Sequence, residues 1–597
     1  MEFARRGCGI DRLPGQGDAV RRRPLGGVRR AQMITTYGVG SMIAIGGESF
    51  MVAGINRWPD DIHEQTINES RLEKRFGVDY FRLPPASESE KYGDVPVVRF
   101  PERHSCPECR RLADARFFGA SASPAKCKNC DRELVPSRFV VCCPKGHISD
   151  FPYFEWLHKG RAAGPSSETK HELSLKAGGR SASLGDIEIS CSCEVPPVTM
   201  EGALRKGALH GITACRGRRP WLVDVKDELC DESPRAMQRG SSAVWFSDVH
   251  SAISIPPWSE GVQKLVGKHW RSLRNAPDPV DRIKELELAD DRRFSVEELA
   301  YAVEQRRREE SGENLSSDSE LKSAEYQALL RETKERSRDQ DFVCVPWQDS
   351  PGLEGLAVDR VMRVKRLREV RVLQGFTRIA PPSPVAPERR SKLHPEDDPP
   401  NWLPAIEVIG EGVFLRIDEE KLLRWESRPE VVERVGVVDT AYRERFVRAD
   451  QTPDRTISPR FMMIHTLAHI VLNEWSLDSG YPAASLRERL YADGGMSGFL
   501  VYTATSDSAG SLGGIVAQVE SGNLGASIRA ALDRASWCSA DPLCMEAHTG
   551  GTDNLNRAAC HACVLLPETS CEEFNTLLDR ALLVGTAQQP GIGFFSL

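Results

Sequence analysis

Cysteines in C-x2-C pairs limit what this chain can fold into more than any other feature of its sequence. Cys106 and Cys109 form one pair in HSCPECRR, and Cys127 and Cys130 form a second in PAKCKNC. Such a turn presents two thiolates from one short loop, and two turns at this separation can supply the four ligands of a tetrahedral zinc ion. The spacing therefore predicts a structural zinc site in a zinc-ribbon-like element.

A set of cysteines near the C-terminus predicts a second zinc site. WCSADPLC supplies Cys538 and Cys544, and AACHAC supplies Cys560 and Cys563. Sites with four thiolates leave no coordination position open for water, so they usually stabilise a fold and do no chemistry. Three nearby residues are alternative ligands: His548, His561 and Cys571.

The remaining cysteines are more scattered, and their spacing matches no recognised zinc pattern. We expect one further zinc site from Cys191, Cys193, Cys215 and Cys230, with buried free thiols as the alternative. Three residues of VVCCPKGH could mark another metal site, although buried thiols beside a strand end are the favoured interpretation: Cys142, Cys143 and His147.

Length and composition indicate a cytoplasmic protein of several domains. With 597 residues, the chain is too long for one hydrophobic core, and it contains 17 cysteines. Its N-terminus lacks the apolar core of a secretory signal, and no run approaches the roughly 18 apolar residues of a membrane span. Its thiols are therefore expected to be reduced or bound to metal.

The net charge of −7 does not by itself predict DNA binding, which would need a local basic patch.

The predicted fold class is mixed α/β (α+β), multidomain, with zinc-ribbon-like elements. Charged segments between 280 and 340 have helical periodicity, and Ser295 with Glu298 has the spacing of a capping box. These helices are expected to be a solvated insert, with a partner-binding arm as the alternative. The expected regions are a basic tail (1–28), a strand-rich region (29–100), a zinc-binding region (101–260), the helical insert (261–345), a mixed segment (346–378), a Pro-rich connector (379–404) and a C-terminal zinc domain (405–597).

Several motifs that often mark catalysis are incomplete. His465 and His469 in HTLAH have the spacing of a zinc-protease helix, but Thr466 stands where that motif needs a general-base Glu. We therefore expect both histidines to pack or hydrogen-bond within their domain. The Ser-rich run at 503–514 contains no nucleophile elbow and is either a phosphate-binding loop or a simple turn region. The phosphate-binding loop of NTPases is also missing, so the chain alone is not expected to be an ATPase.

Taken together, several blocks resemble a known family. HTLAHIVLNEW, CSADPLC and AACHACVLLPETSCEE resemble a domain of unknown function at the C-terminus of certain superfamily 2 DNA helicases. RRAQMITTYGVGSMIAI, CPKGHISDFPYFEWLH and RLREVRVLQGFTRIAPP resemble the DrmB subunits of DISARM anti-phage defence systems. The helicase domain carries a zinc site, which the resemblance maps to Cys538, Cys544, Cys560 and Cys563.

The resemblance implies a non-catalytic subunit that binds DrmA, a helicase-like ATPase, and helps it engage phage DNA. Arginines offer candidate phosphate contacts, because guanidinium groups bind phosphate and stack on bases. The candidates are Arg216, Arg218 and Arg219 beside Trp221, and Arg487 and Arg489, which SLRERLY is expected to place on one helix. The alternative is that these arginines are ion-paired at the surface.

The sequence is also compatible with two other functions. A metal-dependent nuclease acting alone would need an open metal position, for which the candidates are His465, His469, Glu474 and Asp507. A pure assembly scaffold would never touch DNA.

Overall fold

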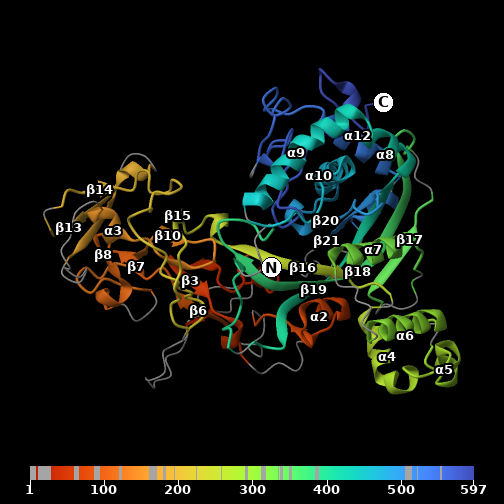
Figure 1. Cartoon of the computed structure of the whole chain (residues 1–597), viewed down its shortest axis with the longest axis horizontal. Helices are drawn as coiled ribbons and strands as arrows, with labels where there is room; N and C mark the ends of the chain where they lie inside the picture. Colours follow the sequence, from red (N-terminus) through yellow and green to blue (C-terminus); the bar gives the residue numbers. More distant parts are fainter. Residues whose placement is uncertain are drawn as a thin grey trace. The chain divides into compact units, whose positions relative to one another are not determined.

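The computed structural model describes the following residues: 8–10, 28–59, 66–85, 94–119, 124–159, 171–178, 183–193, 195–223, 225–256, 258–289, 294–310, 317–333, 335, 340–348, 352–383, 389–397, 399–448, 450–503, 514–520, 522–551 and 554–596. The expected basic tail and the Ser-rich run at 503–514 lie almost wholly outside these ranges, as does Asp507. The fold is α+β and multidomain, as predicted (Figure 1).

The chain divides into two compact units, and each is assembled from separate segments of sequence. The first comprises Met1–Ile67, Phe81–His250 and Val372–Ile406, and the second comprises Asn68–Tyr80, Ser251–Arg371 and Glu407–Leu597. The Pro-rich stretch at 379–404 falls inside the last segment of the first unit. Four strands begin in one unit and end in the other: β5 (Tyr80–Arg82), β16 (Phe246–Ile253), β18 (Val358–Thr377) and β19 (Trp402–Ile417).

The first unit consists mainly of short strands. Its sheets include a four-stranded one of order β1-β6-β3-β2, a three-stranded one of order β11-β10-β15 and a six-stranded one of order β14-β13-β12-β8-β7-β9. Its elements are β1 (Cys8–Ile10), α1 (Gln32–Thr35), β2 (Met42–Ile45), β3 (Glu48–Val52), η1 (Ile55–Arg57), β4 (Thr66–Ile67), β6 (Val95–Arg99), β7 (Arg103–Ser105), β8 (Arg111–Asp114), η3 (Ala115–Phe118), β9 (Val135–Pro136), β10 (Phe139–Cys142), β11 (Ile148–Asp150), α3 (Tyr153–His158), β12 (Leu173–Ala177), η5 (Leu184–Asp186), β13 (Ile187–Cys191), β14 (Val198–Thr199), β15 (Arg235–Gln238) and η6 (Ser242–Val244).

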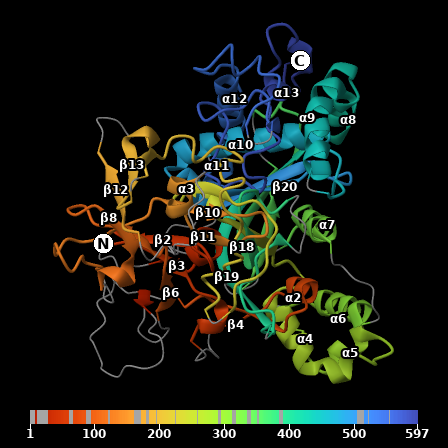
Figure 2. The same ribbon diagram turned by 60° about the vertical axis from the view of Figure 1, so that its left-hand side comes forward.

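The second unit is built of longer helices, among them α10 and α12 (Figure 2), packed on an antiparallel sheet in which β19 pairs with β21 and β21 with β20. Its elements are α2 (Ser70–Phe76), α4 (Glu260–Leu273), α5 (Pro279–Glu285), α6 (Val296–Glu310), α7 (Asp318–Leu329), β17 (Phe342–Pro346), α8 (Glu419–Glu426), α9 (Pro429–Arg448), α10 (Pro459–Ser479), η8 (Ala483–Ser485), β20 (Leu486–Tyr491), β21 (Gly498–Thr503), α11 (Val516–Glu520), α12 (Leu524–Ala535), α13 (Ala581–Val584) and η11 (Pro590–Ile592).

Helix α10 is the centre of the second unit. Its start is fixed by Ser458, whose Oγ accepts a hydrogen bond from Phe461 N at 3.2 Å, and by Pro459 in the first turn. It ends at Gly480, whose φ of 71° is the left-handed conformation that glycine adopts easily. Residues on all its sides are buried, which is the pattern of a core helix. In Figure 1 it lies among α9, α12, β20 and β21.

The charged segments predicted to be helical between 280 and 340 form α5, α6 and α7. Helices α4, α5 and α6 pack around a small apolar core that includes Val266, Leu299 and Val303. The predicted capping box is confirmed, because Ser295 N donates to Glu298 Oε2 at 2.9 Å and Glu298 N donates to Ser295 Oγ at 3.2 Å.

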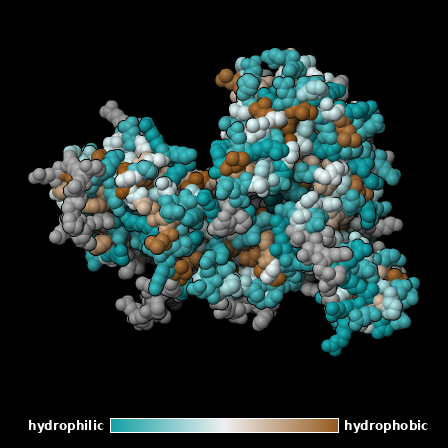
Figure 3. Space-filling model, viewed as in Figure 1, coloured by the Kyte–Doolittle hydropathy of each residue, from teal (hydrophilic) through white to brown (hydrophobic). Residues whose placement is uncertain are grey.

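The face of the molecule drawn in Figure 3 is largely hydrophilic, and hydrophobic side chains occur on it in small separate patches. Among the described residues, none of the helices has both the length and the apolar character that crossing a membrane requires.

Candidate metal centres

Five groups of metal-ligating side chains occur among the described residues. Within each group, one candidate ligand atom per residue lies within 4.8 Å of the others. The groups are site 1 (Cys106, Cys109, Cys127, Cys130), site 2 (Cys143, His147, Cys215, Cys230), site 3 (His158, His171, Cys191, Cys193), site 4 (Cys538, Cys544, Cys560, Cys563) and a buried cluster (His465, His469, Glu488, Cys571).

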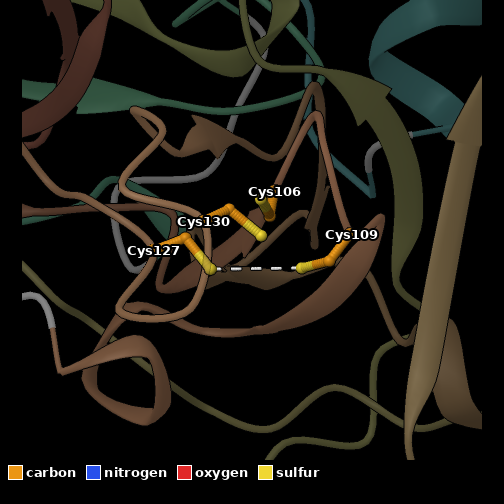
Figure 4. Close-up of side chains that lie close together, drawn as sticks. All are labelled: Cys106, Cys109, Cys127 and Cys130. Atoms are coloured by element: carbon orange, nitrogen blue, oxygen red, sulfur yellow. Dashed lines mark hydrogen bonds between the residues drawn. The ribbon is translucent and has the colours of Figure 1, made fainter.

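Site 1 is made by two turns with the same hydrogen-bonding pattern. In the first, Cys106 N donates to Arg111 O at 3.0 Å, and in the second, Cys127 N donates to Arg132 O at 2.8 Å. Each turn contains a residue with positive φ directly after its second cysteine, namely Arg110 and Asp131. Figure 4 shows the four thiols converging from these turns.

The sulfur separation at site 1 fits a zinc ion and not a disulfide. Cys109 Sγ and Cys127 Sγ are 4.0 Å apart. Zn–S bonds of about 2.3 Å place the sulfurs of a tetrahedral site about 3.8 Å apart. A disulfide bond would instead bring two sulfurs to about 2.05 Å.

Site 2 joins a tight turn after β10 to a distant loop. Cys143 N donates to His147 O at 3.1 Å across a turn in which Gly146 has a φ of 80°. His147 Nδ1 lies 3.3 Å from Cys143 Sγ and 3.6 Å from Cys215 Sγ, while Cys143 Sγ lies 4.0 Å from Cys230 Sγ. All these separations suit ligands of one tetrahedral ion.

A carboxylate holds His147 of site 2 in position. His147 Nε2 lies 3.1 Å from Glu228 Oε2, and Arg219 Nε donates to Glu228 Oε1 at 2.6 Å. The hydrogen bond from Arg219 is the main cause that lowers the pKa of Glu228, so this carboxylate stays ionised. A carboxylate that accepts a hydrogen bond from Nε2 keeps the proton on that nitrogen, which leaves Nδ1 free to bind a metal ion.

Site 3 combines the end of α3 with the end of β13. His158 Nε2 lies 3.4 Å from Cys193 Sγ, and His171 Nδ1 lies 3.2 Å from Cys191 Sγ. His158 Nδ1 donates to Phe154 O at 2.7 Å, which leaves Nε2 facing the thiols. The backbone hydrogen bond from Val195, supported by His158, lowers the pKa of Cys193 to about 6, which favours the thiolate.

The expected joint site of Cys191, Cys193, Cys215 and Cys230 does not form. The structure places the first two in site 3 and the last two in site 2. The reason is that each pair is completed by ligands from another element, which spacing among cysteines cannot reveal. Cys143 and His147, for which buried thiols were favoured, complete site 2, while His158 and His171 were not singled out from the sequence. The i, i+4 spacing of Cys143 and His147 was the available signal.

Site 4 lies just beyond α12 and brings together the four cysteines predicted for it. Its sulfurs are 3.5 Å apart for Cys538 and Cys560, 3.8 Å for Cys544 and Cys563, and 3.7 Å for Cys560 and Cys563. The three alternative ligands lie elsewhere, because His548 and His561 are exposed and Cys571 belongs to the buried cluster.

Two described cysteines with described side chains lie outside all five groups, Cys142 and Cys344. Both are buried, and burial raises the pKa of each to about 12, so they are neutral thiols.

The candidate phosphate-binding arginines all have carboxylate partners. Arg487 and Arg489 lie on strand β20, so the expected helix is wrong. Arg489 is buried and donates to Glu325 at 2.5 and 2.8 Å, and Arg487 pairs with Glu369 at 3.2 Å. These buried carboxylates allow a polar sequence to form a strand inside the core.

The loop arginines near Trp221 are more accessible. Arg216 pairs with Glu155 at 2.7 Å, Arg218 with Glu102 at 2.8 Å and Arg219 with Glu228 at 2.6 Å. Arg216 is the most open, with 45% of its side chain exposed. Glu474, a candidate in the nuclease alternative, is instead paired with Arg534 at 3.0 Å.

Comparison with known proteins shows which family the chain belongs to. A domain of unknown function, DUF8724, matches residues 29–246, and the MrfA Zn-binding domain matches residues 467–564. The DISARM protein DrmB of Bacillus paralicheniformis is 31% identical over 576 residues, covering 92% of this chain and 98% of that protein. The chain belongs to the DrmB family. The predicted resemblance is therefore confirmed over nearly the whole chain.

The matches also account for the metal chemistry of this DrmB-family chain. The zinc-binding domain contains all four cysteines of site 4, and the cysteine groups have the composition of zinc sites, so the protein binds zinc. Sites 1, 2 and 3 lie within the DUF8724 region.

Proposed function

We propose that this chain is a zinc-stabilised, non-catalytic subunit of a cytoplasmic DISARM complex that binds the helicase-like ATPase DrmA and helps it engage phage DNA. The observation that carries this proposal is the 31% identity to a DISARM protein along almost the entire length of both chains.

Sites 1 to 4 would each hold one zinc ion. Every one offers four Cys or His ligands and leaves no ligand position for a substrate, so their contribution is to folding. Such an arrangement suits a subunit that presents surfaces to partners more than one that carries an open catalytic metal.

The partner assignment is tested by co-purification. The full chain, tagged and expressed together with the helicase-like ATPase of its own defence system, should be retained with that ATPase after a wash in salt high enough to strip DNA. Recovery of the tagged chain alone in both low and high salt would contradict the proposal.

The DNA assignment is tested on the complex with Arg216→Ala. Arg216 is half-open to solvent and lies outside the metal ligands, so the change should leave zinc content and partner binding intact. A phosphate contact at this position predicts weaker DNA binding and a salt slope lower by about one. Arg116→Ala is the matched control, because Arg116 has 76% of its side chain exposed and is also paired with a carboxylate. Unchanged DNA binding by both variants would favour the scaffold alternative.

A further inference from the structure

The buried cluster joins three elements in the core of the second unit. His465 and His469 lie one turn apart on α10, Glu488 lies on β20, and Cys571 lies in the loop after site 4. His465, His469 and Glu488 are 0% exposed and Cys571 is 4% exposed. Four side chains that all ligate transition metals are thus gathered where polar groups are costly.

Distances within the cluster match the edges of a coordination tetrahedron. His465 Nε2 lies 3.1 Å from Glu488 Oε1 and 3.3 Å from Cys571 Sγ, and His469 Nε2 lies 3.4 Å from Glu488 Oε1. Zinc bonds of about 2.0–2.1 Å to nitrogen or oxygen and 2.3 Å to sulfur imply edges of about 3.3–3.6 Å.

Neighbouring backbone groups orient two of these side chains as ligands. His469 Nδ1 is 3.0 Å from Val564 O, and because a carbonyl can only accept, the proton is on Nδ1 and the lone pair of Nε2 faces the cluster. Cys571 Sγ accepts hydrogen bonds from Glu573 N and Asn575 N, both at 3.3 Å. A cysteine of site 4 has a similar contact. Its Cys538 Sγ lies 3.4 Å from the backbone N of Ala540, two residues further along the chain, which is the relation of Glu573 to Cys571.

Hydrogen bonds alone leave the cluster incomplete. His469 Nε2 and Glu488 Oε2 are buried and have no hydrogen-bond partner. A cation would satisfy His469 Nε2 and could take both oxygens of Glu488. His465 Nδ1 also has no partner, and metal binding through Nε2 leaves it so.

We propose that His465, His469, Glu488 and Cys571 hold a fifth, structural zinc ion that ties α10 and β20 to the C-terminal loop. The charges support a divalent ion, because one carboxylate and one thiolate with two neutral imidazoles neutralise it in a low-dielectric core. The four ligands leave no coordination position open for a substrate. Thr466, at the position of the general base in zinc proteases, donates to Met462 O at 2.6 Å. The proposed ion is therefore structural and not hydrolytic.

Anomalous X-ray scattering from crystals of the full wild-type chain, grown with zinc, tests this directly. Difference maps collected above and below the zinc edge should show a peak among the four ligand atoms, in addition to those at sites 1 to 4. Peaks at the other sites with none here would overturn the fifth site while leaving the proposed function untouched.

Variants provide a second test in solution. Cys571→Ala should lose one zinc per chain by native mass spectrometry, whereas Cys344→Ser, a buried cysteine outside the groups, should lose none. If Cys571→Ala does not fold, an apolar replacement of the whole cluster (His465→Leu, His469→Leu, Glu488→Leu, Cys571→Ala) removes the uncompensated buried charge. A folded variant of either kind with the full wild-type zinc content contradicts the proposal.

Discussion

The ligands of site 1 in the first unit form part of a small apolar cluster, whereas the metal ligands of the second unit lie beside or inside a much larger one. The cluster around site 1 consists of Cys106, Phe118, Ala125, Cys127 and Leu134, so part of that small core is the ligand set itself. The corresponding cluster of the second unit is far larger and runs from Leu356 to Phe594 around α10. We conclude that zinc replaces apolar burial at site 1 and adds to it in the second unit.

The largest effect should follow from Cys143→Ser at site 2. Structural zinc sites contribute about 10–16 kcal/mol of apparent binding free energy in small peptides, comparable to the about 5–15 kcal/mol that stabilises a whole domain. We expect loss of one zinc and rapid proteolysis between Cys143 and Cys230. Cys142→Ser is the control, since this buried neighbour lies outside the site and should keep all zinc. Equal protease resistance of the two variants would break the comparison.

A smaller effect is expected from Cys560→Ser at site 4. The variant should lose one zinc and expose residues 538–564 to hydrogen exchange, while α10 stays protected by its apolar neighbours. Hydrogen exchange with mass spectrometry distinguishes the two regions. If α10 lost its protection together with site 4, zinc would be as necessary in the second unit as in the first.

Glu228→Gln should weaken zinc binding at site 2 without abolishing it. Removing the charge that holds His147 typically lowers metal affinity about 10–100-fold. Competition with a chromophoric chelator should show one zinc released earlier than in the wild type. Glu155→Gln removes the partner of Arg216, which is not a ligand, and should leave the release curve unchanged.

The smallest effect is expected at helix α6, whose described residues include none of the five groups of metal-ligating side chains. Ser295→Ala removes the cap of α6 and should cost about 1 kcal/mol, seen as faster exchange at the start of that helix. Zinc content should not change, and Ser295→Thr should retain most of the protection. A change in zinc content would connect this region to the metal sites.

Local patterns in the sequence predicted much of this structure. The C-x2-C pairs of sites 1 and 4, the capping box at Ser295 and the helix that became α10 all follow from residues close together in the chain. Their physics is local, since a turn or a cap is decided within a few residues.

Other features depended on partners far away in the chain. Sites 2 and 3 each combine ligands from separate elements, and Glu488 joins histidines on another element. The segment of β20 was predicted to be a helix, whereas in the structure the buried Glu325 and Glu369 pair with its arginines and allow a strand there. Pairings of this kind arise from tertiary folding, and local spacing shows at most one side of each, as for Cys143 and His147 of site 2.

The interleaved division of the chain has a consequence for its synthesis on the ribosome. The first unit needs the segment that ends at Ile406, and the second closes only with residues beyond Glu407. Helix α10, apolar on nearly every side, emerges about a hundred residues before Cys571 reaches it. We therefore expect the first unit to keep an incomplete core until the segment ending at Ile406 has been made, and the second until the C-terminal region has followed, so that apolar surface stays exposed on the nascent chain.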